Sequence, residues 1–172
     1  MKYISTRDNT KEYNFEQVFI KGLADDGGLY VPKLLKKFST EELLKFKNLN
    51  YNALSTEIIS LFLEDFISKE NLSSLINKSY STFREKEVVK ISSIGEIKLL
   101  ELFHGPTLAF KDVAMQLIGN LYEYYLSKND KKINIVVATS GDTGAAAIES
   151  IKGKSNLNIF VLHPNNKISS VQ

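Results

Sequence analysis

Two short apolar runs, each rich in β-branched and aromatic residues, enclose a helical segment in the last third of the chain. Residues 133–138 read Ile-Asn-Ile-Val-Val-Ala, and residues 157–162 read Leu-Asn-Ile-Phe-Val-Leu. Runs of this kind are typical of strands that are buried on both faces of a parallel sheet. The segment between them, residues 143–152, predicts a helix that stops at Gly153. This order of elements predicts a right-handed βαβ crossover in an open α/β sheet.

A longer helical stretch precedes this unit. Residues 1–87 are expected to be mainly helical after a short start, with a glycine-punctuated turn and an extended piece at residues 22–32. Apolar residues recur at helical spacing in residues 53–67 and 72–83, and Ser39 opens a predicted capping box. The first half of the chain therefore lacks the regular strand-and-helix alternation of the second half.

The pattern then changes. Residues 88–91 and 97–102 read as strands joined by a turn, and residues 111–127 as a helix with one apolar face. We therefore divide the chain into a mainly helical region, 1–87, and the first part of an α/β region, 88–172. Two buried-type strands cannot make a covered sheet by themselves. We expect further residues or a partner chain to complete the sheet, and its open edge offers a surface for self-association.

Composition excludes several classes of protein. The 172 residues carry a net charge of only +2, and the lysines are scattered, which argues against a nucleic-acid partner. The chain has no cysteine and two histidines, which excludes disulfides, thiol catalysis and a histidine-rich metal site. No apolar run is long enough for a membrane span, and the N-terminus lacks a signal-peptide core. We expect a cytoplasmic protein without a membrane partner.

Lys111 occupies an unusual position for a lysine. It lies at a strand-to-helix junction, between apolar residues 108–110 and 113–115. A cation in the first turn of a helix opposes the helix dipole by about 0.3–1 kcal/mol, and apolar surroundings lower the pKa of an ammonium group. A neutral amine there can form a Schiff base with an aldehyde cofactor. The alternative is an ordinary solvated lysine, which is the commoner state for this residue type.

A second unusual stretch, residues 139–144, reads Thr-Ser-Gly-Asp-Thr-Gly and opens the next predicted helix. Backbone N–H groups at a helix start attract anions, and Ser140 and Thr143 add hydroxyl donors, so the stretch can hold a carboxylate or phosphate. It fits a glycine-rich turn with an Asp or Thr helix cap about equally well. It is neither a Walker loop nor a Rossmann fingerprint.

For two aromatic side chains near Lys111 in the sequence, the residues alone leave two possible roles each. His104, seven residues earlier, is expected either to contact a ligand or to cap a backbone group. Phe110 belongs either to the core or to the wall of a pocket.

Taken together, these stretches resemble a known enzyme family. Residues 101–112, Glu-Leu-Phe-His-Gly-Pro-Thr-Leu-Ala-Phe-Lys-Asp, are similar to the pyridoxal-phosphate attachment signature of fold type II enzymes, in the form of the threonine synthases. Residues 138–146 resemble the substrate and cofactor loop of the same family. Residues 22–32 and 163–169 resemble further family segments, so the resemblance covers the chain in order. Asp142 stands where many relatives have asparagine, which favours threonine synthase over a dehydratase.

The resemblance implies a reaction, a cofactor and a set of site residues. Threonine synthases are carbon–oxygen lyases that convert O-phospho-L-homoserine and water to L-threonine and phosphate, with pyridoxal 5'-phosphate held by a lysine. By resemblance, Lys111 is the catalytic lysine and bears the cofactor, with Phe110 and Asp142 as further cofactor contacts. No metal is implied. The implied substrate-binding residues are Thr139, Ser140, Gly141, Thr143 and Gly144.

The family also implies a fold: a helical N-terminal region followed by the start of an open βαβ parallel sheet, incomplete at the C-terminus. Family enzymes are longer, and their loop for the cofactor phosphate lies beyond residue 172. We therefore expect the 172 residues alone to have little activity. Two alternatives stay open: another fold type II enzyme, such as a serine/threonine dehydratase or a phospho-lyase, or a non-catalytic fragment that binds an anion or a partner.

Overall fold

The chain divides into two compact units in a computed structural model that describes residues 1–139 and 141–167. The units are Met1–Ser74 and Leu75–Gln172, and helix α4 (Lys69–Tyr80) contributes residues to both. The mixed α/β class is confirmed, while the division at residue 87, drawn from the change in helix and strand pattern, stays a prediction. Within the described ranges, no helix has the length and apolar character needed to cross a membrane.

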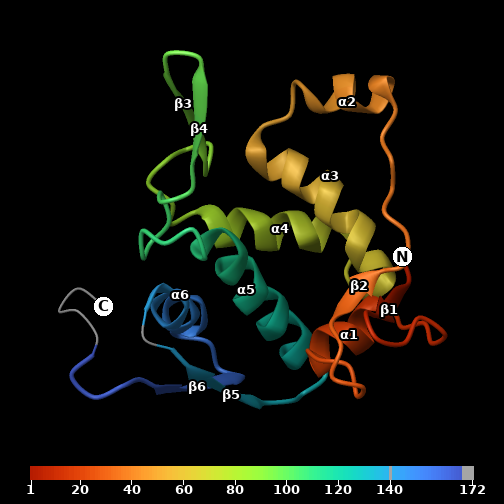
Figure 1. The fold of residues 1–172 in the computed structure, drawn as a ribbon, viewed down its shortest axis with the longest axis vertical. Helices are drawn as coiled ribbons and strands as arrows, with labels where there is room; N and C mark the ends of the chain where they lie inside the picture. The colour runs from red at the N-terminus through yellow and green to blue at the C-terminus, as the bar shows by residue number, and fades with distance from the viewer. Residues whose placement is uncertain (140, 168–172) are drawn as a thin grey trace. The chain divides into compact units, whose positions relative to one another are not determined.

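Unit 1 combines a small antiparallel sheet with short helices (Figure 1). Asn14, Ser39 and Asn50 each precede a helix, and each side chain accepts a hydrogen bond from a backbone amide in the first turn. The capping box predicted at Ser39 is confirmed, because Glu42 accepts a hydrogen bond from the Ser39 amide. The elements are β1 (Tyr3–Ser5), α1 (Phe15–Lys21), β2 (Tyr30–Pro32), α2 (Thr40–Phe46), α3 (Tyr51–Leu63) and the 3-10 helix η1 (Glu64–Phe66).

The predicted glycine-rich turn before β2 is held by one carboxylate. Asp26 accepts hydrogen bonds from the Ser5 hydroxyl and from the Gly28 amide, each at 2.8 Å. Gly28 approaches β1 so closely that a Cβ there would lie 2.2 Å from the Ser5 hydroxyl oxygen. Gly27 has a φ of +76°, which an L side chain rarely adopts. Both glycines are therefore required by the backbone path of the turn.

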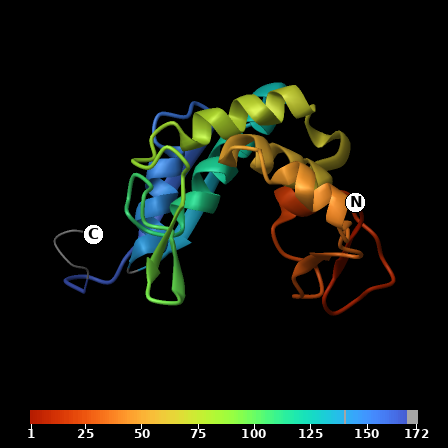
Figure 2. The same cartoon turned by 90° about the horizontal axis from the view of Figure 1, so that it is seen from above.

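Unit 2 holds two separate pairs of strands and the helices between them. The β3–β4 hairpin turns at Gly95, with a φ of +60°, and extends away from α5 and α6 (Figures 1 and 2). The predicted strands, turn and helices are all present, although β3 begins at Lys90 rather than at Val88. The elements after α4 are β3 (Lys90–Ile94), β4 (Ile97–Glu101), α5 (Asp112–Lys128), β5 (Ile133–Ala138), α6 (Asp142–Ile151) and β6 (Leu157–Leu162).

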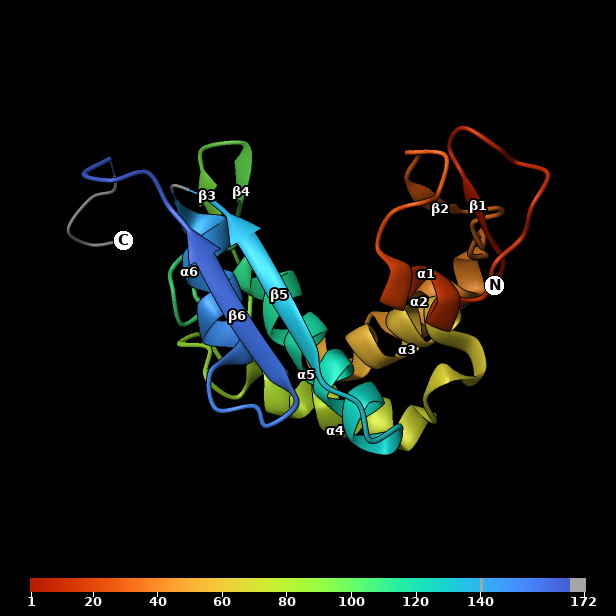
Figure 3. The same cartoon turned by 90° about the horizontal axis from the view of Figure 1, so that it is seen from below.

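The β5–β6 pair is parallel, as predicted, with Ile133 opposite Leu157 at the start of the two strands. Helices α5 and α6 lie against one face of the pair, and Figure 3 looks onto the other face. On that second face Val136 is 65% exposed and Phe160 is 56% exposed. Within the described chain the helices therefore cover one face only, and the expectation that further residues or a partner chain complete the sheet stays a prediction.

A buried polar network joins α4, α5 and the loop after α6. The Asn120 amide donates to the Ser79 hydroxyl at 2.8 Å, and the Lys154 ammonium donates to the Asn120 carbonyl oxygen at 2.7 Å. Burial lowers the pKa of Lys154, and the nearby charge of Lys78 lowers it further. The network fixes α5 from two sides with hydrogen bonds rather than with apolar contacts alone.

Candidate functional site at the starts of helices α5 and α6

The loop between β4 and α5, residues 102–111, is tied to the first residue of the helix. Asp112 is fully buried, and its carboxylate accepts hydrogen bonds from the Thr107 amide at 2.7 Å and from the Thr107 hydroxyl at 2.9 Å. Gly105 lies against the same group, since a Cβ there would lie 2.4 Å from the Asp112 Cβ. A carboxylate also suits the positive end of the helix dipole. Asp112 therefore anchors the loop from inside.

Lys111 sits at the N-cap position of α5 with helical backbone angles. Its side chain is half-buried, and its Nζ lies 4.9 Å from the centre of the Phe110 ring. Phe110 is 56% exposed and Leu108 is 50% exposed, whereas Ala109 is buried. In the described structure, the amine therefore lies on an apolar surface formed by its neighbours, and a cation near an aromatic face is a favourable arrangement.

The loop after β5 leads directly into α6. The Thr139 amide donates to the Leu162 carbonyl at 3.0 Å, which extends the parallel pairing by one residue. The Thr139 hydroxyl accepts a hydrogen bond from the Gly141 amide at 3.3 Å. Gly141 is the N-cap of α6 and has no side chain to cap the helix, so the first-turn amides are suited to an anion. A Cβ on Gly144 would lie 2.3 Å from the Thr139 methyl group.

Helices α5 and α6 run side by side in the same direction. Gly119 packs against the Ser150 carbonyl, and farther along both segments the Glu123 carboxylate accepts a hydrogen bond from the Ser155 amide. The later residue of one segment contacts the later residue of the other, so the two helices point the same way. Their N-termini therefore lie at the same end of the helical layer. Lys111 immediately precedes α5, and Asp142 is the first residue of α6. Both residues therefore lie at the same end of the helical layer.

This shared end coincides with the carboxyl end of β5. Only four residues separate the last residue of α5, Lys128, from the first residue of β5, Ile133, so α5 runs back antiparallel to the strand. A 17-residue helix is about 25 Å long and a six-residue strand about 20 Å, and the start of α5 thus lies beyond Ala138. In open α/β sheets, ligands bind outside the carboxyl ends of the strands.

The structure therefore brings most of the predicted site residues to one end of unit 2. Asp142 is exposed there, Thr139 and Thr143 are half-buried, and Gly144 is buried. Ser140 lies outside the described residues. The roles assigned to these side chains stay predictions, because the structure gives their places and hydrogen bonds alone.

The His104 side chain is held by a carboxylate rather than by a backbone group, and contact with a ligand, the other role that the sequence left open, stays a prediction. Its Nε2 lies 2.9 Å from a carboxylate oxygen of Glu101, and its carbonyl accepts a hydrogen bond from the Arg84 amide at 2.8 Å. Hydrogen bonding by the Ser92 side chain, and then by His104, lowers the pKa of Glu101. These hydrogen bonds tie the loop that leads to Lys111 to the end of β4 and to Arg84.

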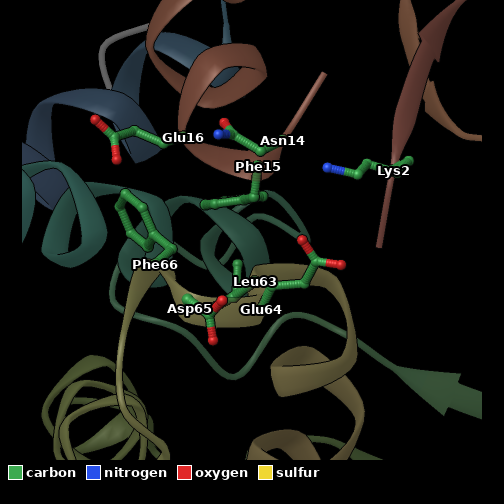
Figure 4. A pocket seen from close by; sticks show the side chains of 8 residues that line it. All are labelled: Lys2, Asn14, Phe15, Glu16, Leu63, Glu64, Asp65 and Phe66. Atoms are coloured by element: carbon green, nitrogen blue, oxygen red, sulfur yellow. The ribbon is translucent and has the colours of Figure 1, made fainter. Parts of the chain in front are cut away.

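A separate pocket lies wholly within unit 1 and was not indicated by any sequence motif. It encloses about 250 Å³ (Figure 4). Phe15 and Phe66 form an aromatic contact at one side, with ring centres 5.0 Å apart, and Glu64 also pairs with the amino group of Met1. The lining residues are Lys2, Asn14, Phe15, Glu16, Leu63, Glu64, Asp65 and Phe66.

The arrangement in unit 2 combines two chemical capacities. A primary amine on an apolar surface can capture a carbonyl compound, and the uncapped start of a helix can bind an acid group. Sequence reasoning missed Thr107, whose two hydrogen bonds to Asp112 close the loop. A threonine five residues before an aspartate at the first position of a helix was the available signal.

Comparison with known proteins finds a consistent similarity to one family. The family model described as "Threonine synthase N terminus" matches residues 2–80. A threonine synthase of Pseudomonas aeruginosa is 43% identical over 173 residues, which cover 100% of this chain and 37% of that protein. The chain thus spans little more than a third of the length of this relative.

Solved structures show the same similarity. The crystal structure of PLP-bound threonine synthase from Brucella melitensis superposes with a TM-score of 0.94 at 40% identity, covering 99% of this chain and 37% of that chain. Threonine synthase from yeast gives a TM-score of 0.92 at 41% identity, with 98% and 36% covered. The similarity therefore extends over both units and includes the loops that precede α5 and α6.

Proposed function

This chain corresponds to the N-terminal region of the threonine synthase family, and from that premise we propose that it supplies the cofactor lysine and a substrate-binding loop of a threonine synthase. The proposed reaction converts O-phospho-L-homoserine and water to L-threonine and phosphate. The observation that carries the proposal is the placement of Lys111 and Asp142 at one end of two parallel helices, in a chain that matches threonine synthases along its whole length.

The described residues fit pyridoxal phosphate in part. The aldehyde of the cofactor requires a primary amine, and Lys111 presents one beside the exposed face of Phe110. The ring requires an apolar surface, which Phe110 and Leu108 offer with half of each side chain exposed. The donor chemistry at the α6 start suits acid groups of cofactor or substrate. When bound, the cofactor supplies an electron sink that makes hydrogens near the substrate amine acidic.

Lys111 is proposed to hold the cofactor at rest and to move protons at the α and β carbons of the substrate afterwards. An amine can do both because its neutral form is a base and its ammonium form is an acid. The fixed N-cap backbone of Lys111 limits where the amine can reach. Positioning of this kind matters because proton transfer requires hydrogen-bond distance between the amine and each carbon-bound hydrogen.

The loop of residues 139–144 is proposed to bind the carboxylate or phosphate of O-phosphohomoserine. The Thr143 amide and the hydroxyls of Thr139, Ser140 and Thr143 are the donors, whereas the Gly141 amide already donates to the Thr139 hydroxyl. Gly144 lets the helix start lie close to Thr139 and so shapes the loop. Asp142 carries a negative charge and would repel an anion. We therefore propose that its carboxylate accepts a hydrogen bond from a donor group of the cofactor or the substrate. In the net reaction, phosphate leaves the γ carbon and water adds at the β carbon.

A chimera tests this function directly. Residues 1–172 would replace the matching segment of the Brucella melitensis enzyme, which is 40% identical to this chain. We expect the chimera, supplied with pyridoxal phosphate, to release phosphate and form threonine from O-phosphohomoserine. The matched control is the same chimera with Lys111→Ala, which should lose this activity and keep its circular dichroism spectrum.

Two results would overturn the proposal. One is a folded chimera that binds pyridoxal phosphate but forms no threonine. The other is release of ammonia and a keto acid, which would indicate a dehydratase. The isolated chain is predicted to show little turnover, so the chimera rather than the isolated chain decides the matter.

A further inference from the structure

The hydrogen bonds between Thr107 and Asp112, called here the Thr107–Asp112 clamp, close a short ring in the chain just before α5. The Thr107 amide and hydroxyl donate to the two carboxylate oxygens of Asp112, at 2.7 Å and 2.9 Å respectively. Residues 108–111 form the enclosed segment, with Lys111 as its last member. A clamp of this size fixes the backbone that presents the lysine amine.

The clamp joins a half-buried threonine, Thr107, to a buried carboxylate, and the segment that it encloses is partly exposed. Asp112 is 0% exposed, and Ala109 is 7% exposed, while Phe110 is 56% exposed. A buried carboxylate is costly unless hydrogen bonds replace its water, and Thr107 supplies one such bond to each oxygen. The segment therefore turns Ala109 and Asp112 inward and leaves Phe110 on the surface.

The segment is also held in a strained conformation. Leu108 has a φ of +64°, which is uncommon for a non-glycine residue, and its amide donates to the Gly105 carbonyl at 3.2 Å. Gly105 must lack a side chain, because a Cβ would lie 2.5 Å from a carboxylate oxygen of Asp112. Strain of this kind persists only where surrounding contacts fix it, and the clamp supplies those contacts.

Both carboxylate oxygens of Asp112 face Thr107, although Lys111 is the neighbouring residue in sequence. The carboxylate therefore acts on the backbone path of the loop. An aspartate directed at the amine would hold it as an ammonium ion, whereas an aspartate directed at Thr107 can place the amine without pairing with it.

We propose that Asp112 and Thr107 are positioning residues for Lys111, acting through the loop and making no contact with the reacting atoms. The proposal rests on the function proposed above for Lys111. It extends the site from the residues of the two helix starts to Thr107, which lies outside the set expected from the sequence.

The test compares four variants of the full chain with the wild type. Thr107→Val keeps the shape of the side chain and removes its hydroxyl, and Thr107→Ser restores the hydroxyl. Asp112→Asn keeps the size of the buried group and removes its charge. Tyr80→Phe is the matched control, because the Tyr80 hydroxyl donates to the Val113 carbonyl at 3.0 Å and so also ties down the start of α5.

Two quantities are measured for each folded variant. The first is hydrogen exchange of the peptide that covers residues 103–111. The second is the share of pyridoxyl label on Lys111, relative to exposed Lys128, after incubation with pyridoxal phosphate and borohydride reduction. We expect Thr107→Val and Asp112→Asn to speed exchange by about tenfold, as loss of a hydrogen bond to a charged group implies, and to lower the Lys111 share at least about fivefold.

Thr107→Ser should restore both quantities, and Tyr80→Phe should leave both near the wild-type values. The proposal is overturned if Thr107→Val changes exchange and leaves the labelling of Lys111 unchanged, because the clamp would then be structural only. It is also overturned if Tyr80→Phe lowers the labelling as much as Thr107→Val does. Absence of preferential label on Lys111 in the wild type would contradict the proposed function itself, and with it the role of the clamp.

Discussion

Gly119 of α5 packs directly onto the backbone carbonyl of Ser150 in α6. A Cβ at residue 119 would lie 2.4 Å from that oxygen, closer than real Cβ contacts come. This contact sets the spacing of the two helices whose starts form the candidate site. Gly119→Ala is therefore expected to push the helices apart and to lower the free energy of unfolding by about 1–3 kcal/mol. Urea denaturation, followed by circular dichroism, measures the change.

Ala114→Ser is the control for this substitution, because Ala114 is exposed on the same helix. It should change the free energy of unfolding by less than about 0.5 kcal/mol. Equal stability of the Gly119→Ala variant and the wild type would contradict the close packing of α5 on α6.

Gly144 and Thr139 make a second tight pair at the start of α6. Gly144→Ala is expected to displace the Thr139 side chain, since the added Cβ would lie 2.3 Å from its methyl group. The cost is about 1–3 kcal/mol. Combining it with Thr139→Ser removes the methyl group and keeps the hydroxyl that the Gly141 amide contacts. The double variant should recover most of the loss in urea denaturation. A double variant no more stable than Gly144→Ala would show that another contact is responsible.

Lys154 should make stability depend on pH in the alkaline range. Burial, and then Lys78, hold the pKa of Lys154 below the ordinary value of 10.5 in the folded chain. Between the lowered pKa and 10.5 the unfolded chain binds more protons at this residue, so its contribution to the free energy of unfolding rises with pH. Below the lowered pKa the contribution is constant. Lys154→Met is expected to remove this rise.

The measurement is urea denaturation at several pH values and constant ionic strength, comparing each variant with the wild type. The difference from the wild type separates the contribution of Lys154 from those of Tyr3 and Tyr122, whose pKa values are raised by burial. Lys152→Met is the matched control, since Lys152 is exposed just after α6. Identical pH profiles for the wild type and Lys154→Met would contradict the assignment.

Much of the fold could be predicted from local sequence signals. The residues of β5 and β6 are those of the two apolar runs, and the capping box at Ser39 is present as expected. Such elements depend on propensity and on residues a few positions apart. Self-association through the sheet and a cytoplasmic location stay predictions.

Some features that shape the site depend on contacts between distant residues, and others on a loop conformation that residue spacing alone does not specify. The close approach of Gly119 to Ser150 joins two helices, and the positive φ of Leu108 is imposed by the loop around it. The sequence drew attention to Lys111 through its unusual position and its family resemblance. It did not single out Thr107, because a threonine in a loop is ordinary until its hydrogen bonds are seen.

The most direct test of the central claim is to map where pyridoxal phosphate attaches to this chain. After incubation and borohydride reduction, proteolysis and mass spectrometry measure the label on each lysine, with Lys128 and Lys152 as exposed references. We predict that Lys111 carries more label than any other lysine, and that O-phosphohomoserine lowers its labelling selectively. Label on Lys111 that is no greater than on Lys128 and Lys152 would contradict the account.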